Sequence, residues 1–146
     1  MREPLRQALA RTVTLPGGET LVVDECEALT VIDVNSAANV QTGPDFALRQ
    51  NLSVCGEIAR QLRLRGIGGM VIVDFVDMPS PEQRARVEAA LTQALTADRV
   101  KTVVHGFTSL GLMELTRKRA RKTLREQLTQ PCAHCAGNGR IETKEA

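Results

Sequence analysis

Two acidic residues each follow a short apolar run: Asp33 ends a run that begins at Leu29, and Asp74 ends one that begins at Met70. Each run carries Val and Ile on both sides of its pleat, which is typical of a buried strand, and a helical pattern separates the two runs. Ligands bind beyond the carboxyl ends of parallel strands in such sheets. The sequence therefore predicts that Asp33 and Asp74 lie side by side at one edge of a sheet.

Two carboxylates held that close together repel each other unless a cation lies between them. Mg²⁺ binds one or two protein carboxylates and completes its coordination shell with water and phosphate oxygens, so the pair predicts a magnesium site for phosphoryl chemistry. Asn35 shares a strand face with Asp33 and is a candidate to orient a carboxylate or a bound water. For either acid alone, capping of the next helix or pairing with a lysine is the alternative.

A second motif that can do chemistry is the CxxC formed by Cys132 and Cys135, which is followed by two glycines. Two thiolates at this spacing can bind one zinc ion. Zinc takes four ligands, so we expect the same motif of a second subunit to complete the site, with His134 as an open alternative for a third ligand. A redox CxxC is the competing interpretation, although such motifs usually open a helix after a strand. Cys26 and Cys55 are predicted to be packing residues.

The chain of 146 residues is 42% hydrophobic, which fits one globular unit with a sizeable core. It has three Phe and no Trp or Tyr, so an aliphatic core is expected and stacking of bases on aromatic side chains is not. No apolar run is long enough for a membrane span, and the first residues lack the apolar stretch of a secretory signal. We therefore expect a cytoplasmic protein with no membrane span.

Periodicity and turn residues predict an α/β fold: a mixed, mostly parallel sheet flanked by helices, with an N-terminal β-hairpin and a C-terminal CxxC zinc knuckle. Residues 1–130 are expected to form the domain, and residues 131–146 the knuckle and a charged tail. A polar loop from Ala37 to Pro44 should follow the first acid-ending strand. The remaining expected elements are a helix in 2–10, a hairpin of 12–15 with 19–23, helices starting after Asp45 and Ser80, and a strand over 100–105.

The last expected helix, from Leu110 to about Leu128, contains most of the basic residues of the chain's C-terminal third. Its cationic side chains are candidates to bind phosphate groups, and the alternative is a solvated helix end enriched in cations. The candidate phosphate-binding residues are Arg117, Lys118, Arg119, Arg121 and Lys122.

Several segments, taken in order, resemble the ribonuclease E/G family. The first ends on Asp33-Val-Asn-Ser36, the third contains Asp74-Phe-Val-Asp-Met78, and the last is the CxxC with its glycines. The matching segments are residues 27–36, 58–65, 68–78, 111–119 and 132–139.

This resemblance implies the deoxyribonuclease I-like catalytic subdomain and zinc link of an endoribonuclease that cuts single-stranded RNA. In that family the acids that match Asp33 and Asp74 hold magnesium, and the asparagine that matches Asn35 steadies them. Hydrolysis leaves a 5′-phosphate and a 3′-hydroxyl. The cysteines that match Cys132 and Cys135 join a homodimer through one shared zinc.

Members of that family also carry an S1 domain, a 5′-phosphate pocket and a ribonuclease H-like part, which this sequence does not supply. We therefore expect either a portion of a larger enzyme or a chain that works with an S1-domain-containing partner. The alternative function is a non-catalytic module that dimerises through zinc and binds RNA.

Overall fold

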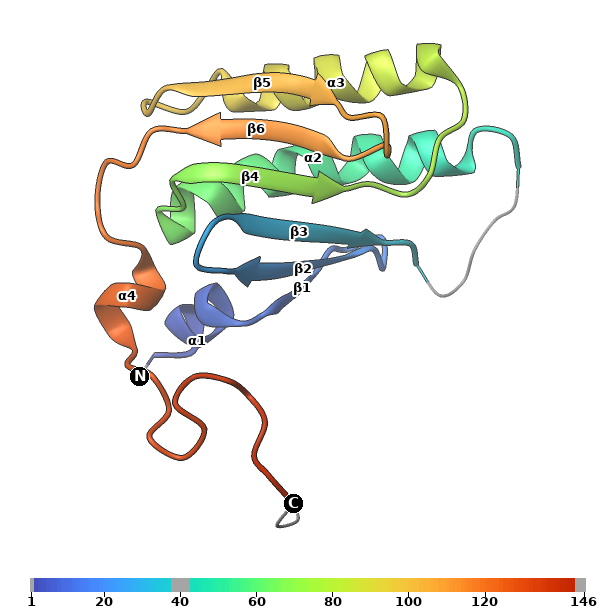
Figure 1. Cartoon of the computed structure of the whole chain (residues 1–146). Helices are drawn as coiled ribbons and strands as arrows, with labels where there is room; N and C mark the ends of the chain where they lie inside the picture. The colour runs from blue at the N-terminus through green and yellow to red at the C-terminus, as the bar shows by residue number, and fades with distance from the viewer. Residues whose placement is uncertain (1, 38–42, 144–146) are drawn as a thin grey trace.

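The computed structural model describes residues 2–37 and 43–143. Its centre is a six-stranded sheet with strand order β1-β2-β3-β4-β6-β5 (Figure 1). The helices α2 and α3 lie behind this sheet in Figure 1, and α1 lies beside its β1 edge. The elements are α1 (Glu3–Leu9), β1 (Thr12–Thr14), β2 (Thr20–Glu25), β3 (Thr30–Asn35), α2 (Phe46–Arg65), β4 (Gly69–Asp74), α3 (Pro81–Leu95), β5 (Thr102–Phe107), β6 (Met113–Arg117) and α4 (Leu124–Leu128).

The mixed sheet, its flanking helices and the N-terminal hairpin are confirmed, but the expectation of mostly parallel pairing is wrong. Among the described strands only β3 and β4 pair in parallel, and α2 is the crossover between them. The other pairs, β1–β2, β2–β3, β4–β6 and β5–β6, are antiparallel. Short turns join β1 to β2, β2 to β3 and β5 to β6, and a direct turn permits only antiparallel pairing.

Local sequence signals explain where the two long helices begin and end. Helix α3 begins with Pro81 at its first position, and the side chain of Ser80 accepts a hydrogen bond from the backbone N–H of Gln83, as expected for an N-cap. Helix α2 ends at Gly66, which adopts the left-handed conformation with φ 65°. Asp45 precedes α2 without capping it, because its carboxylate instead accepts a hydrogen bond from the Gln83 side chain at 3.2 Å. No helix in residues 2–37 and 43–143 is long and apolar enough to cross a membrane.

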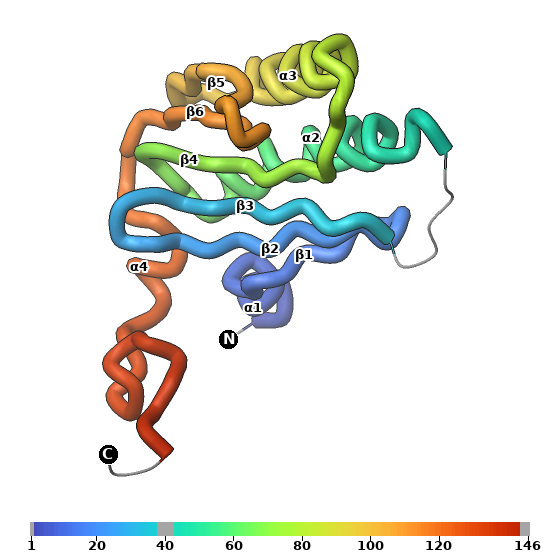
Figure 2. Tube along the Cα trace, turned by 45° about the vertical axis from the view of Figure 1, so that its right-hand side comes forward, coloured from blue at the N-terminus to red at the C-terminus, as the bar shows by residue number. Residues whose placement is uncertain are grey.

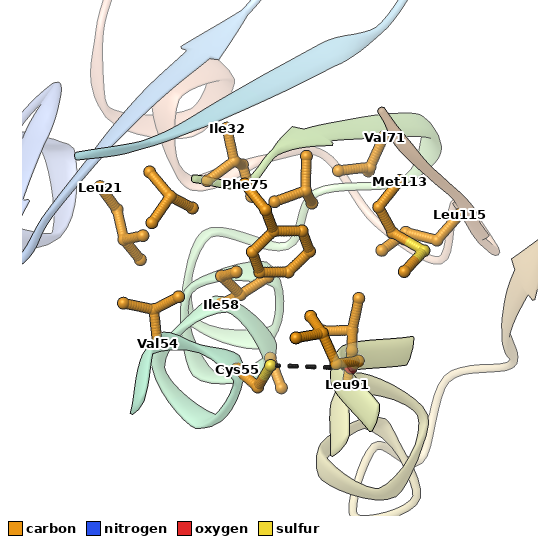
Figure 3. Close-up of a cluster of buried hydrophobic side chains, with 14 of the residues drawn as sticks. Leu21, Ile32, Val54, Cys55, Ile58, Val71, Phe75, Leu91, Met113 and Leu115 are labelled. Atoms are coloured by element: carbon orange, nitrogen blue, oxygen red, sulfur yellow. Dashed lines mark hydrogen bonds between the residues drawn. The ribbon is translucent and has the colours of Figure 1, made fainter. Parts of the chain in front are cut away.

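One face of the sheet packs on α2 and α3, and no helix of the described residues covers the other (Figure 1). Figure 3 shows side chains of the sheet, among them Leu21, Ile32 and Met113, pointing toward Val54 of α2 and Leu91 of α3. Burial alternates along the strands, with the pattern BiBiBe on β3, so every second side chain leaves the core. We call the uncovered side, which carries these alternate residues, the open face.

The prediction of one helix from Leu110 to about Leu128 is wrong. The chain turns at Gly111, which has φ 82°, and returns as strand β6 between β4 and β5. Met113 and Leu115 are buried while Glu114 is exposed, which is the alternation of a strand. Helix α4 covers only Leu124–Leu128, so the basic residues before it are not helical.

A buried ion pair fixes the end of β6. Arg117 donates hydrogen bonds to Asp98 from Nε at 2.8 Å and from Nη2 at 3.2 Å, and its Nη1 donates to the carbonyl of Ile67 at 2.9 Å. The two side chains are only 6% and 2% exposed. Burial raises the pKa of Asp98, but the hydrogen bonds from Arg117 and the Val100 N–H outweigh this effect, so that its pKa is lowered overall. Arg117 is therefore a structural residue, and its guanidinium is not free to bind RNA.

Asp98→Asn should destabilise the fold because it leaves the Arg117 charge buried without a counterion, at a cost of about 3 kcal/mol at pH 7. The pKa of Asp98 is depressed in the folded chain, so its contribution is present above its unfolded pKa and disappears as the pH falls through the folded value. Denaturant unfolding at pH 7 and pH 3 should therefore show a stability difference between wild type and variant that is smaller at pH 3. Asp24→Asn, which breaks the exposed pair with Arg11, is the control and should change stability little at either pH.

Candidate active site

Asp33 and Asp74 lie side by side, as predicted. They are Cα partners in the parallel ladder of β3 and β4, and theirs is the last pair of that ladder. Their neighbours Ile32 and Val73 are fully buried on the helix-covered face, so both acids belong to the open face. Asp33 is half-buried and Asp74 is exposed. Adjacent strands are about 4.8 Å apart, so the two acidic side chains start from neighbouring positions at this edge of the sheet.

Asn35 is the third predicted site residue and lies at the end of β3. It is exposed, it is the Cα partner of Thr20 on β2, and it shares the open face with Asp33. The structure thus brings Asp33, Asn35 and Asp74 to one edge of the sheet. The polar loop expected from Ala37 to Pro44 lies for the most part outside the described residues.

The side chains that hold the backbone after β4 were not expected from the sequence. Asn51 of α2 is completely buried, donates from Nδ2 to the carbonyl of Val76 at 2.8 Å, and accepts from the Val76 N–H at 3.0 Å. Arg84 of α3 donates from Nε to the carbonyl of Met78 at 2.7 Å. The sequence signal for Asn51 was its position in the apolar stripe of α2, three residues after Leu48 and four before Cys55.

The basic residues lie at the far end of the sheet from the acids. Strand β6 runs antiparallel to β4, and its end at Arg117 pairs with Gly69, the first residue of β4. Five residue steps separate Gly69 from Asp74, or about 17 Å. Exposed cations follow Arg117, and we call them the basic segment: Lys118, Arg119, Arg121 and Lys122. The basic segment therefore cannot contact the same phosphate as the carboxylate pair.

The cysteine knuckle, residues 131–139, hangs from α4 at the same far end (Figure 2). Its tight turn uses positive φ at Ala136 and Gly137, and the Gly139 N–H donates to Sγ of Cys135 at 3.2 Å. Hydrogen bonds from the backbone of Cys135 and His134 lower the pKa of the exposed Cys132 thiol. A lowered thiol pKa and an N–H bonded to sulfur both favour thiolates, the form that binds metal.

A groove of about 940 Å³ separates the knuckle from the β2–β3 turn and is lined by Cys26, Arg119, Cys132 and Cys135, among others. Within the described residues no three His, Cys, Asp or Glu side chains are grouped so that they could hold a metal ion, so Cys26 does not complete a site with the pair. Cys26 is exposed, and its prediction as a packing residue is wrong because it lies in a turn outside the core. Cys55 is buried as predicted, and burial raises its pKa to about 12.

The fold and site together define a mixed α/β domain that carries a pair of acids at the carboxyl end of its parallel strand pair, with a two-cysteine knuckle at its other end. The sequence model of the Ribonuclease E/G family matches residues 1–120 of this chain. The chain therefore belongs to the ribonuclease E/G family.

Curated relatives show the same similarity. Ribonuclease G of Escherichia coli strain K12 is 44% identical over 143 residues, and Ribonuclease E of the same strain is 38% identical over 144 residues. Ribonuclease G of Haemophilus influenzae is 42% identical. Each match covers 97% of this chain, but the chain spans only 29% of the Ribonuclease G relatives and 14% of the Escherichia coli Ribonuclease E.

The cysteines should differ in reactivity. In metal-free folded protein at neutral pH, iodoacetamide should modify Cys132 faster than Cys26, because the lowered pKa of Cys132 leaves more of it as thiolate. Cys55 should react only after unfolding, since it is buried and its pKa is raised. Peptide mass spectrometry of timed samples would measure this order. Modification of Cys55 in the folded chain at the rate of Cys132 would contradict the described burial.

Proposed function

We propose that this chain is the catalytic domain of a magnesium-dependent endoribonuclease that hydrolyses single-stranded RNA to 5′-phosphate and 3′-hydroxyl ends in RNA processing and decay. The observation that supports this most directly is the pairing of Asp33 with Asp74 at the open end of β3 and β4. Membership of the ribonuclease E/G family supplies the substrate class. We also infer that the enzyme acts in the cytoplasm, where its RNA substrates occur.

The donor atoms at this edge fit Mg²⁺. The ion prefers one or two carboxylates and takes its other ligands from water and phosphate, which matches two neighbouring acids on an open surface. When bound, it would activate water and neutralise charge on the scissile phosphate. In this proposal Asp33 and Asp74 hold the ion, and Asn35 orients one carboxylate through its side-chain amide.

The basic segment is proposed to bind RNA away from the cut. Because it follows the end of β6 that pairs with Gly69, about 17 Å along β4 from Asp74, its cations would attract phosphates upstream or downstream of the scissile bond. Arg117 is excluded from this role by its buried pair with Asp98. The chain contains no Trp or Tyr, so most affinity for bases should come from a partner such as an S1-domain-containing protein.

The cysteine knuckle is proposed to link two chains through one zinc ion. Each chain offers Cys132 and Cys135, and zinc requires four ligands. The hydrogen bond from Gly139 to Cys135 and the lowered pKa of Cys132 prepare both sulfurs for the metal. Joining two knuckles places two catalytic domains and two basic segments in one particle, which would strengthen RNA binding through multivalency.

The nuclease proposal predicts that Asp33→Asn and Asp74→Asn each lower the rate of RNA cleavage by about a hundredfold or more, because each removes a charged ligand of the magnesium ion. The assay uses a 5′-monophosphorylated single-stranded RNA with Mg²⁺, alone and with an S1-domain-containing partner added. Asp24→Asn is the matched control. It makes the same change on β2, opposite Val31 and two residue steps from the partner of Asp33, and should cleave like the wild type.

Equal rates for wild type and both site variants would remove the site assignment. Salt-dependent RNA binding without cleavage, even with the partner present, would instead favour the non-catalytic RNA-binding module. The observation that favours this second function is the location of the basic segment far from the acids, because RNA could bind there without reaching them.

The zinc proposal predicts one zinc ion per two chains and a dimer in solution. Cys132→Ser should lose the metal and become monomeric, because two ligands of the shared site disappear at once. Cys26→Ser is the matched control and should keep both metal and dimer, since Cys26 lies outside the pair. Elemental analysis with light scattering measures both quantities, and zinc that stays bound to the Cys132→Ser dimer would refute the shared site.

A further inference from the structure

One polar side chain in the apolar layer under the sheet is Asn51 of α2. It is 0% exposed and is surrounded by core residues such as Val54 and Cys55. A buried amide is costly unless it is hydrogen-bonded. Asn51 directs both ends of its amide to one backbone residue, Val76, at 2.8 Å and 3.0 Å. The side chain thus pairs with Val76 as a neighbouring strand would.

The preceding residue of α2 makes the corresponding contact on the other strand. Oε1 of Gln50 accepts a hydrogen bond from the Ala37 N–H at 3.3 Å. Val76 lies two residues after Asp74, and Ala37 lies four residues after Asp33. Two successive residues of one helix therefore hold the two chain segments that leave the carboxylate pair.

These contacts begin where the backbone ladder stops. The pairing of β3 with β4 ends at Asp33 and Asp74, so no further rung of that ladder fixes the separation of the chains beyond the two acids. Helix α2 is the crossover that joins the two strands, and its position is fixed by the fully buried Val54 and Ile58. The side-chain amides transfer this fixed position to both strand ends.

We propose that Gln50 and Asn51 are positioning residues that set the spacing and direction of the Asp33–Asp74 pair by holding Ala37 and Val76. The inference rests on the proposed magnesium site and deepens it. Asn51 makes the larger contribution, because it is completely buried and forms two hydrogen bonds, whereas Gln50 is half-buried and forms one. Neither residue touches the metal or the RNA.

The test is a Mg²⁺ titration of the whole chain, followed by the backbone amide NMR signals of residues 33–35 and 74–77. Asn51→Leu keeps a branched side chain but cannot bond to Val76. It should weaken Mg²⁺ binding about tenfold or more, as loss of a group that orients a metal ligand does. Gln50→Leu should weaken it less, and hydrogen exchange at Val76 should accelerate only in Asn51→Leu.

Val54→Ala is the matched control, because it creates a defect in the same buried turn of α2 without removing a hydrogen bond to Val76. It should lower the unfolding temperature but leave Mg²⁺ affinity within twofold of the wild type. If Asn51→Leu and Val54→Ala weaken Mg²⁺ binding equally, the positioning role is overturned, but the proposed metal site is not. Wild-type Mg²⁺ binding that survives Asp33→Asn would remove the proposed metal site and this inference with it.

Discussion

The structure depends on the register between β3 and β4. On the covered face, Ile32, Val71 and Val73 are fully buried, and on the open face Asp33 meets Asp74. A slip of one residue would turn every side chain of a strand to the opposite face, so that a carboxylate would enter the core and apolar side chains would enter water. An unpaired charge in the core is far more costly than one lost contact. The same apolar burial that stabilises the sheet therefore also fixes the position of the acids.

Helix α2 connects stability with the site. Its apolar stripe packs against the sheet, which is the usual reason for such a helix to form. Asn51 interrupts that stripe, and a leucine there would serve packing better if packing were the only requirement. The interruption lies opposite Val76, just beyond the end of the parallel ladder. Core packing and positioning of the strand ends thus share one helix surface.

The sequence allowed the acid-ending strands to be predicted because their signals are local. Apolar runs that end on Asp33 and Asp74, with Gly66 ending α2 and Ser80 starting α3, fix most of the elements around the site. Strand β6 could not be predicted in this way, since Met113–Arg117 is rich in residues that also favour helices. Its state is decided by pairing with β4 and β5 and by Asp98, which lies far from Arg117 along the chain. The role of Asn51 was missed for the same reason, because its partner Val76 is distant in sequence.

The separation of charges on the molecule constrains how the proposed enzyme would hold RNA. Acids at one end of the strands repel phosphate unless a cation is bound, while the basic segment at the other end attracts it. A strand of RNA that touches both must cross the open face, where Val31, Ile72 and the 53% exposed Met70 lie. These aliphatic side chains can contact bases but offer neither stacking platforms nor base-specific hydrogen bonds. Under the proposed function these aliphatic side chains therefore guide the RNA strand between the basic segment and the acids without selecting among base sequences.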